Sequence, residues 1–194
     1  ETLSALRSIP NLSVIRPADA NETAQAWAAA IEYKPSPKGL ALSRQGLPVL
    51  EGTKEKAYDG VRRGAYVLVE ASKETPDVIL IATGSEVQIA VAAAKELEDA
   101  GTATRVVSAP CLEWFDEQDE TYRESVLPSS VRARVSVEAG IAMPWHKYTG
   151  SFGRNISIEL YGASAPAAEL FEKLGFTTAA VVEAAQESLA AAAK

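Results

Sequence analysis

The chain has 194 residues, which permits one large domain or one small and one ordinary domain, and 47% of them are hydrophobic, enough to bury a core. Its formal net charge of −7, with no basic stripe, argues against nucleic acid as a partner. No apolar run approaches the ~20 residues of a membrane span, and we see no signal peptide. These features predict a soluble, cytoplasmic protein, and Glu1 in place of an initiating Met predicts a processed or truncated chain.

Residues 1–45 are predicted to form a partial α/β unit. A helix end, a strand, a helix and a second strand follow one another, at residues 3–8, 12–15, 19–34 and 39–42. Asp19 is expected to cap the longer helix, with Glu22 completing a capping box. The buried face of this helix is predicted from apolar residues at helical spacing, namely Ala24, Trp27, Ala28 and Ile31. One β-α-β piece has too little sheet for a core of its own, so we expect it to belong to something larger.

Residues 46–64 combine glycine, proline and mixed charges, which predicts a linker between domains. Residues 65–194 are predicted to form a complete α/β domain, because strands and helices alternate as they do in mostly parallel sheets covered by helices on both faces. The strands are expected at residues 65–69, 78–82, 105–108, 131–137 and 156–160. The helices are expected at residues 85–100, 113–127, 164–174 and toward the C-terminus.

Two details of this domain can be predicted from its sequence. The helix after the second strand is expected to begin with Ser85 as its cap and to end at Gly101 in the left-handed conformation. Its predicted buried residues are Val87, Ala90, Ala94 and Leu97. The last helix is predicted to bury Val181, Val182, Ala185 and Leu189.

The turn Thr83-Gly84-Ser85-Glu86 lies between a strand and a helix, where backbone N–H groups can hold an anion. It lacks the three-glycine dinucleotide motif and the lysine of a phosphate-binding loop. Glu86 would also repel a phosphate, so an ordinary helix start is favoured over an anion site at Gly84 and Ser85.

The remaining polar clusters are interpreted as structural. The acidic residues Glu113, Asp116, Glu117, Asp119 and Glu120 point around several helix faces, which predicts a solvated surface. Glu138, His146 and Lys147 lack a spaced nucleophile, and Trp145 and Tyr148 are expected to pack in the core. Cys111 stands alone, so it can form no intrachain disulfide and is expected to be a buried apolar residue. We therefore predict no catalytic, cofactor-binding or metal-binding residue in this chain.

Arg44 is the candidate that remains, within Ser43-Arg44-Gln45-Gly46-Leu47-Pro48. It follows residues 39–42, which are predicted to be a buried strand. An arginine at the carboxyl end of a parallel strand is well placed to bind a phosphate. On the chemistry of Arg44 alone, a salt bridge within the protein would be its commoner role.

Several motifs in fixed order resemble those of transketolases, of the bacterial type. They are Leu6-Arg7-Ser8-Ile9-Pro10-Asn11, Arg16-Pro17-Ala18-Asp19, Leu42-Ser43-Arg44-Gln45-Gly46-Leu47-Pro48, Ile81-Ala82-Thr83-Gly84-Ser85-Glu86-Val87, Ser136-Val137-Glu138-Ala139-Gly140 and Trp145-His146-Lys147-Tyr148-Thr149-Gly150. The resemblance implies that residues 1–45 are the tail of the pyrimidine-binding domain and residues 65–194 the C-terminal domain. It covers essentially the whole chain.

The resemblance also implies a function for a complete enzyme: transfer of a two-carbon ketol unit between ketose and aldose phosphates, in the pentose phosphate pathway. Such an enzyme is a homodimer that uses thiamine diphosphate with Mg or Ca. Arg44 would bind the sugar phosphate, with Ser43 as a weaker candidate. Most of the active site would lie in the remaining transketolase domains, so we expect this chain alone to be inactive and to bind no cofactor.

Two alternatives stay open at this stage. The C-terminal domain could be an independent module that binds a small anion at Gly84 and Ser85, or that has a regulatory or structural role. Among relatives, a dihydroxyacetone synthase would share the Arg44 motif, so the sequence does not separate that specificity from transketolase.

Overall fold

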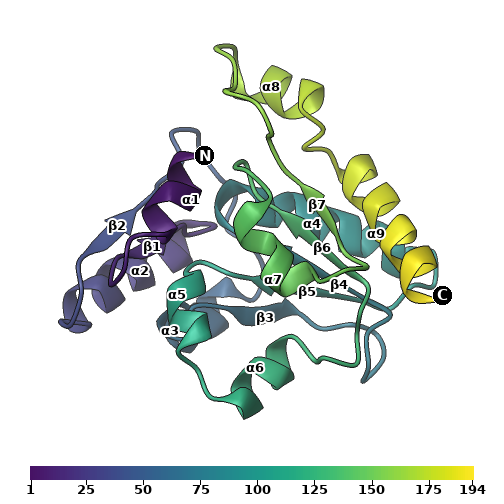
Figure 1. Ribbon diagram of the computed structural model, residues 1–194, viewed down its shortest axis with the longest axis horizontal. Coiled ribbons are helices and arrows are strands. Elements are labelled where there is room, and N and C mark those ends of the chain that lie inside the picture. The colour runs from purple at the N-terminus through teal and green to yellow at the C-terminus, as the bar shows by residue number, and fades with distance from the viewer.

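The computed structural model describes all residues, 1–194, and contains two separate sheets (Figure 1). The strands are β1 (Ser13–Ile15), β2 (Lys38–Leu40), β3 (Tyr66–Val69), β4 (Val78–Ala82), β5 (Thr104–Ser108), β6 (Arg134–Val137) and β7 (Arg154–Ile156). The α-helices are α1 (Thr2–Arg7), α2 (Ala20–Glu32), α3 (Thr53–Arg62), α4 (Val87–Asp99), α5 (Leu112–Asp116), α6 (Glu120–Val126), α7 (His146–Thr149), α8 (Ala167–Lys173) and α9 (Thr178–Ala192). Two short 3₁₀ turns are η1 (Gly84–Glu86) and η2 (Met143–Trp145). None of the helices combines the length and apolarity needed to cross a bilayer.

The N-terminal unit has the predicted order of elements, with β1 and β2 paired in parallel and α2 between them in sequence. Asp19 caps α2 as predicted, because its Oδ1 accepts the backbone N–H of Glu22 at 2.9 Å. The expected reciprocal bond is absent: the Glu22 carboxylate accepts from the N–H of Ala18 at 2.7 Å and from the hydroxyls of Tyr66 and Ser108. Glu22 therefore joins this unit to the larger domain instead of closing a capping box.

The predicted buried face of α2 is wrong. Trp27 and Ile31 are 52% and 73% exposed, whereas Ala26 and Ala29 are buried. Both stripes recur at helical spacing, so periodicity alone does not say which one faces inward. The small alanines let α2 pack closely against α3, and this close approach selects their stripe.

Strand β2 is half-buried along its whole length, which corrects the expectation of a buried strand at residues 39–42. Strand β1 is buried because α1 and α5 also pack against it, whereas β2 packs chiefly against β1. The segment 46–64, for which the sequence predicts a linker and no helix, contains α3. Ala57 and Val61 of α3 are buried against α2 and α5, so this connection is a packed element of the structure.

The second sheet has the strand order β3-β5-β4-β6-β7 and is parallel except for β3, which runs antiparallel to β5. Successive side chains along its strands point alternately to the two faces of the sheet, and a hydrophobic core lies on each face. Leu80 faces the core under α4 and α9, and Ile81 faces the core under α5, α6 and α7. Figure 1 shows these helices on the two sides of the sheet, with the N-terminal unit (purple) at one end. The predicted fold, a mostly parallel sheet between helices after a partial α/β unit, is confirmed.

The local predictions in this domain are confirmed in part. Helix α4 buries the predicted stripe of Val87, Ala90, Ala94 and Leu97. Gly101 adopts the predicted left-handed conformation after this helix, with φ of 85°. The expected helix over residues 113–127 is two shorter helices, α5 and α6, and the predicted strand over 131–137 begins only at Arg134.

Candidate functional site

Arg44 lies in the loop that leaves β2. The N–H of Ala41 still donates to the carbonyl of Ile15 at 2.9 Å, so this loop starts where both parallel strands, β1 and β2, end. The Arg44 side chain is exposed and makes no hydrogen bond, ion pair or aromatic contact with the rest of the chain. Arg44 therefore forms no internal salt bridge in this structure, although that role is the commoner one for an arginine.

Arg44 differs in this respect from every other arginine of the chain. Carboxylates pair with Arg7, Arg16, Arg62, Arg105 and Arg154. Backbone carbonyls accept from Arg123, Arg132 and Arg134, and Arg63 lies over the Tyr122 ring. Ser43, the weaker candidate, is half-buried with a hydroxyl that makes no hydrogen bond, and it is close to Arg44 as its neighbour in the chain.

The carboxyl end of β1 is joined directly to the carboxyl ends of the larger sheet. The N–H of Arg16, which follows β1, donates to the carbonyl of Pro110 beyond β5 at 2.8 Å. The carbonyl of Arg16 accepts the N–H of Gly84, which follows β4, at 3.0 Å. The carboxyl edges of the two sheets therefore face each other at the junction of the two units. In α/β folds, ligands bind at such edges.

A buried network of charges fills this junction. The Nη1 of Arg16 donates to Oε2 of Glu86 at 2.9 Å and to Oε1 of Glu138 at 3.0 Å. Arg7 binds both oxygens of Glu138, at 2.7 and 2.8 Å, and the indole N–H of Trp145 donates to Glu138 at 2.7 Å. Two arginines from the N-terminal unit are therefore held by two carboxylates of the C-terminal domain.

The network sets the ionisation of its members. Burial alone would raise the pKa of Glu138, but the hydrogen bonds and charge of Arg7, with the charge of Arg16, outweigh it and hold that pKa below its ordinary value. Burial would likewise lower the pKa of Arg16, and Glu86 and Glu138 together raise it instead. Both residues are therefore charged in the folded protein, and each needs its partners.

The candidate anion site at Gly84 and Ser85 is filled by the chain itself. The Gly84 N–H is bonded to Arg16, and the Ser85 hydroxyl donates to the Glu86 carboxylate. A Cβ at Gly84 would lie 2.9 Å from the Cζ of Arg16, so glycine is needed here to admit the guanidinium. Ser85 is also not the cap of α4, because it lies within η1 and its side chain is turned to Glu86. The structure thus gives the independent anion-binding module no support at this turn.

The other candidate residues have structural positions. Glu138 belongs to the buried network, His146 is exposed, and Lys147 pairs with Asp116 at 2.7 Å. Trp145 and Tyr148 are buried in the core, as predicted. Cys111 is buried too, and burial raises its thiol pKa well above the ordinary value.

The acidic cluster is only partly a solvated surface. Glu113 is half-buried and accepts the N–H of Val14 at 3.2 Å, and Asp116 accepts the hydroxyl of Tyr148 at 2.9 Å. These carboxylates therefore attach α5 to β1 and α7. No group of three or more His, Cys, Asp or Glu side chains is arranged to hold a metal ion.

Sequence reasoning missed the four-residue network, although one signal was available. Arg16, Glu86 and Glu138 each stand within a few residues of the end of an apolar strand, at 13–15, 78–82 and 134–137. Charged residues at the carboxyl ends of neighbouring parallel strands meet at one edge of a sheet, so the grouping of Glu86 and Glu138, after β4 and β6, could have been expected. Arg16 follows a strand of the other sheet, and its approach to them depends on how the two units pack.

Two protein-family profiles match the chain. Residues 64–177 match the transketolase-like C-terminal domain, and residues 1–49 match the transketolase pyrimidine-binding domain. The first match covers more than half of the chain and includes all the strands of the second sheet, β3 to β7. The chain belongs to the transketolase family.

Individual relatives agree with this assignment. A transketolase of Mycobacterium leprae is 56% identical over 97% of this chain, and the match covers 27% of that protein. A Pichia stipitis transketolase, solved in complex with sedoheptulose 7-phosphate, is 42% identical with a TM-score of 0.88 over 98% of this chain and 27% of its own. A split-gene transketolase described as an inactive β4 tetramer is 29% identical with a TM-score of 0.74, over 97% of this chain and 60% of its own. The chain thus spans about a quarter of the length of the full transketolases it matches.

The residues of this chain do not by themselves fit thiamine diphosphate. A diphosphate held through a divalent cation needs a set of oxygen ligands, and no such group is present. The buried carboxylates Glu22, Glu86 and Glu138 are each bonded to donors of the chain itself.

Proposed function

We propose that this chain forms the part of a transketolase that binds the phosphate of the sugar substrate, through Arg44. The observation that carries this proposal is the exposed Arg44 guanidinium, the one arginine of the chain with no partner of its own. A planar guanidinium binds a phosphate through two parallel hydrogen bonds, and it keeps its charge at any physiological pH. Ser43 would contribute at most a secondary contact.

In a complete enzyme, Arg44 would act by orientation. The transferred two-carbon unit reacts at the end of the sugar remote from the phosphate, and thiamine diphosphate supplies the carbanion chemistry. Binding energy gained at the phosphate then helps to hold the carbonyl in a reactive position. The complex of the Pichia stipitis relative with a sugar phosphate supports this substrate class.

The chain alone is proposed to be inactive. It contains no residue to which we assign a catalytic role, and the ion pairs among Arg7, Arg16, Glu86 and Glu138 hold the two units together. The split-gene relative, described as inactive in its β4 form, supports this proposal. Ketol transfer by this chain with added cofactor and Mg²⁺ or Ca²⁺ would contradict it.

The wider setting is also a proposal. The family resemblance supports a cytoplasmic, homodimeric enzyme of the pentose phosphate pathway that binds thiamine diphosphate with Mg²⁺ or Ca²⁺. The remaining transketolase domains would be the chain's partners in that enzyme. Whether the acceptor range is that of a transketolase or of a dihydroxyacetone synthase would be read from its kinetics with different aldehydes.

In a complete transketolase that contains this segment, Arg44→Ala is expected to raise KM for phosphorylated donor and acceptor sugars by roughly 10- to 100-fold. This range corresponds to the loss of about 1.5–3 kcal/mol from a hydrogen bond to a charged group. Steady-state kinetics with a ketose phosphate and an aldose phosphate would measure it. Arg44→Lys should have a smaller effect, since it keeps the charge but loses the two-pronged geometry.

Two comparisons make this test specific. An unphosphorylated donor sugar should react with the Arg44→Ala enzyme as it does with the unmodified enzyme. Lys54→Ala, which removes an exposed cation from α3, should change no KM. Unaltered KM values for the phosphorylated sugars in Arg44→Ala would remove Arg44 from the substrate site.

A further inference from the structure

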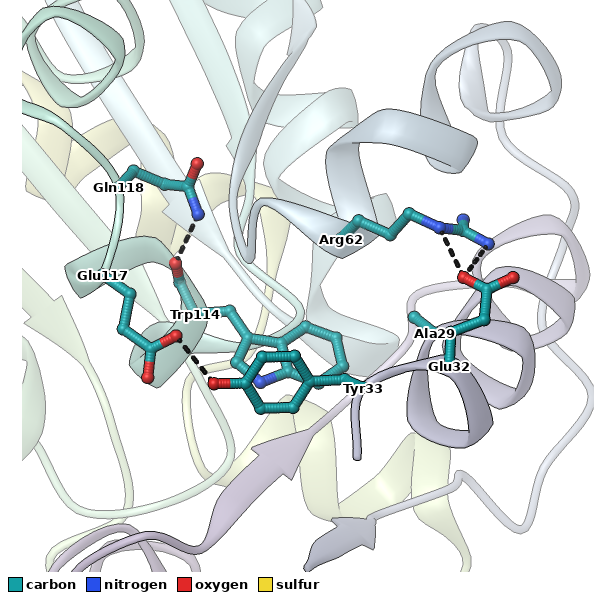
Figure 2. A pocket seen from close by; sticks show the side chains of 7 residues that line it. All are labelled: Ala29, Glu32, Tyr33, Arg62, Trp114, Glu117 and Gln118. Carbon is teal, nitrogen blue, oxygen red and sulfur yellow. Dashed lines mark hydrogen bonds and ion pairs between the residues drawn. The ribbon is translucent and has the colours of Figure 1, made fainter. Parts of the chain in front are cut away.

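A cavity of about 300 Å³ lies where α2, α3 and α5 end, at the junction of the N-terminal unit and the C-terminal domain. Figure 2 shows its lining, with Tyr33 and Trp114 in the middle, Glu117 and Gln118 at one end, and the pair of Arg62 and Glu32 at the other. This volume is at the lower end of the range for small-molecule sites, and it suits a ligand with one ring.

The wall of the cavity is aromatic. The rings of Tyr33 and Trp114 lie 5.5 Å apart between centroids, at 54° to one another. The indole N–H of Trp114 is already bonded to the hydroxyl of Ser13 at 3.0 Å. Trp114 is only 4% exposed, so the ring surface that a ligand can contact is mainly that of Tyr33, which is half-buried. Tyr33 already attracts one cation, because Nζ of Lys38 lies 4.8 Å from its ring centroid.

The polar groups around the aromatic wall mostly accept hydrogen bonds. One oxygen of Glu117 accepts from the Tyr33 hydroxyl at 3.2 Å, and the other makes no hydrogen bond. The carboxylate of Glu117 has no ion-pair partner. Gln118 uses its amide N–H on the carbonyl of Trp114, at 2.9 Å, which leaves its oxygen as an acceptor.

The one cation of the lining is already in use. Arg62 pairs with Glu32 at 2.8 Å and also donates to Gln25 and to the carbonyl of Tyr58. The lining residues include two carboxylates and one guanidinium, so their formal charge is −1. Lys38 lies near one side of the Tyr33 ring, so the group of the lining that favours a cation over an anion is the Glu117 carboxylate, which has no ion-pair partner.

We propose that this cavity binds a flat organic cation, an aromatic ring that carries a protonated amine or an amidinium group. The ring would lie against Tyr33, next to Trp114, and the charged group would donate to Glu117. The cavity is lined by α2, α3 and α5 together, so a bound ligand would also hold the N-terminal unit against the C-terminal domain. The proposal concerns residues other than Arg44, and its failure would leave the proposed function intact.

Benzamidinium, benzamide and benzoate test this proposal, because the three probes share a ring and differ in charge. Titrations of the 194-residue chain, followed by the NMR signals of its three indole N–H groups, should show saturable binding of benzamidinium. The Trp114 signal should move, while those of Trp27 and Trp145 stay in place. Benzamide should bind more weakly and benzoate not at all.

Glu117→Gln should weaken benzamidinium binding by roughly two- to fivefold, in the range of an exposed charge pair, and bring its affinity close to that of benzamide. Glu183→Gln, at an exposed position of α9, is the matched control and should leave binding unchanged. The proposal is overturned if benzamidinium does not bind, if benzoate binds equally well, if the Trp114 signal does not respond, or if Glu117→Gln has no effect.

Discussion

Replacing Glu138 by Gln is expected to lower the free energy of unfolding by about 3–5 kcal/mol, the usual cost of removing one partner from a buried ion pair. Glu138 is 1% exposed and accepts from Arg7, Arg16 and Trp145. Its amide analogue keeps the shape but loses the charge, so Arg7 is left buried without a counter-ion. Urea-induced unfolding followed by circular dichroism would measure the loss.

The control for this variant is a pair on the surface. Glu187→Gln removes the partner of Arg154, at a site where both side chains are well exposed. Its expected effect is below about 1 kcal/mol, since surface pairs contribute little. Equal effects of Glu138→Gln and Glu187→Gln would show that the buried network does not stabilise the junction.

The effect of Glu138→Gln should depend on pH with a definite sign. The pKa of Glu138 in the folded protein lies below its ordinary value of 4.5, so its contribution is fully present above that value. It is lost as the pH falls through the folded-state pKa. Glu22 acts in the opposite sense, because burial raises its pKa. The difference between the unmodified chain and Glu138→Gln cancels Glu22, and this difference should shrink on acidification below pH 4.5.

The sequence predicts the fold correctly where a local residue pattern is compatible with only one structure. The all-apolar strand 78–82 with a helix after it, and glycines such as Gly101 at helix ends, leave little choice, and the structure agrees. Helix α2 has two faces at helical spacing that could be buried. Which of them is buried depends on packing against α3, a helix that the sequence does not predict. Tertiary packing decided between patterns that are locally equivalent.

The site shows the same limit. The motif around Arg44 could be noticed because it is contiguous in sequence and resembles a family motif. The network of Arg7, Arg16, Glu86 and Glu138 spans up to 131 residues of sequence, and no local pattern reports such a separation. The cavity beside Trp114 was equally hidden, because its walls come from three helices that meet only in the folded chain.

Gly64→Ala is expected to destabilise the chain by roughly 2–5 kcal/mol. Gly64 has φ of 84°, a conformation that costs an L-residue about 1–2 kcal/mol. A Cβ there would also lie 2.2 Å from the carbonyl oxygen of Cys111 and 2.3 Å from the nitrogen of Phe115. These are backbone atoms at the start of α5, and overpacking of this kind adds about 1–3 kcal/mol. Thermal and urea unfolding would measure the combined loss.

Gly101→Ala separates the two causes. Gly101 has nearly the same φ, 85°, but a Cβ there would meet no atom within 4 Å. Its substitution should therefore cost only the backbone strain, about 1–2 kcal/mol. The excess of Gly64→Ala over Gly101→Ala then measures how firmly the start of α5 is held against β3. If the two variants were equally stable, the start of α5 would be free to shift away from Gly64, and its close packing there would contribute nothing to stability.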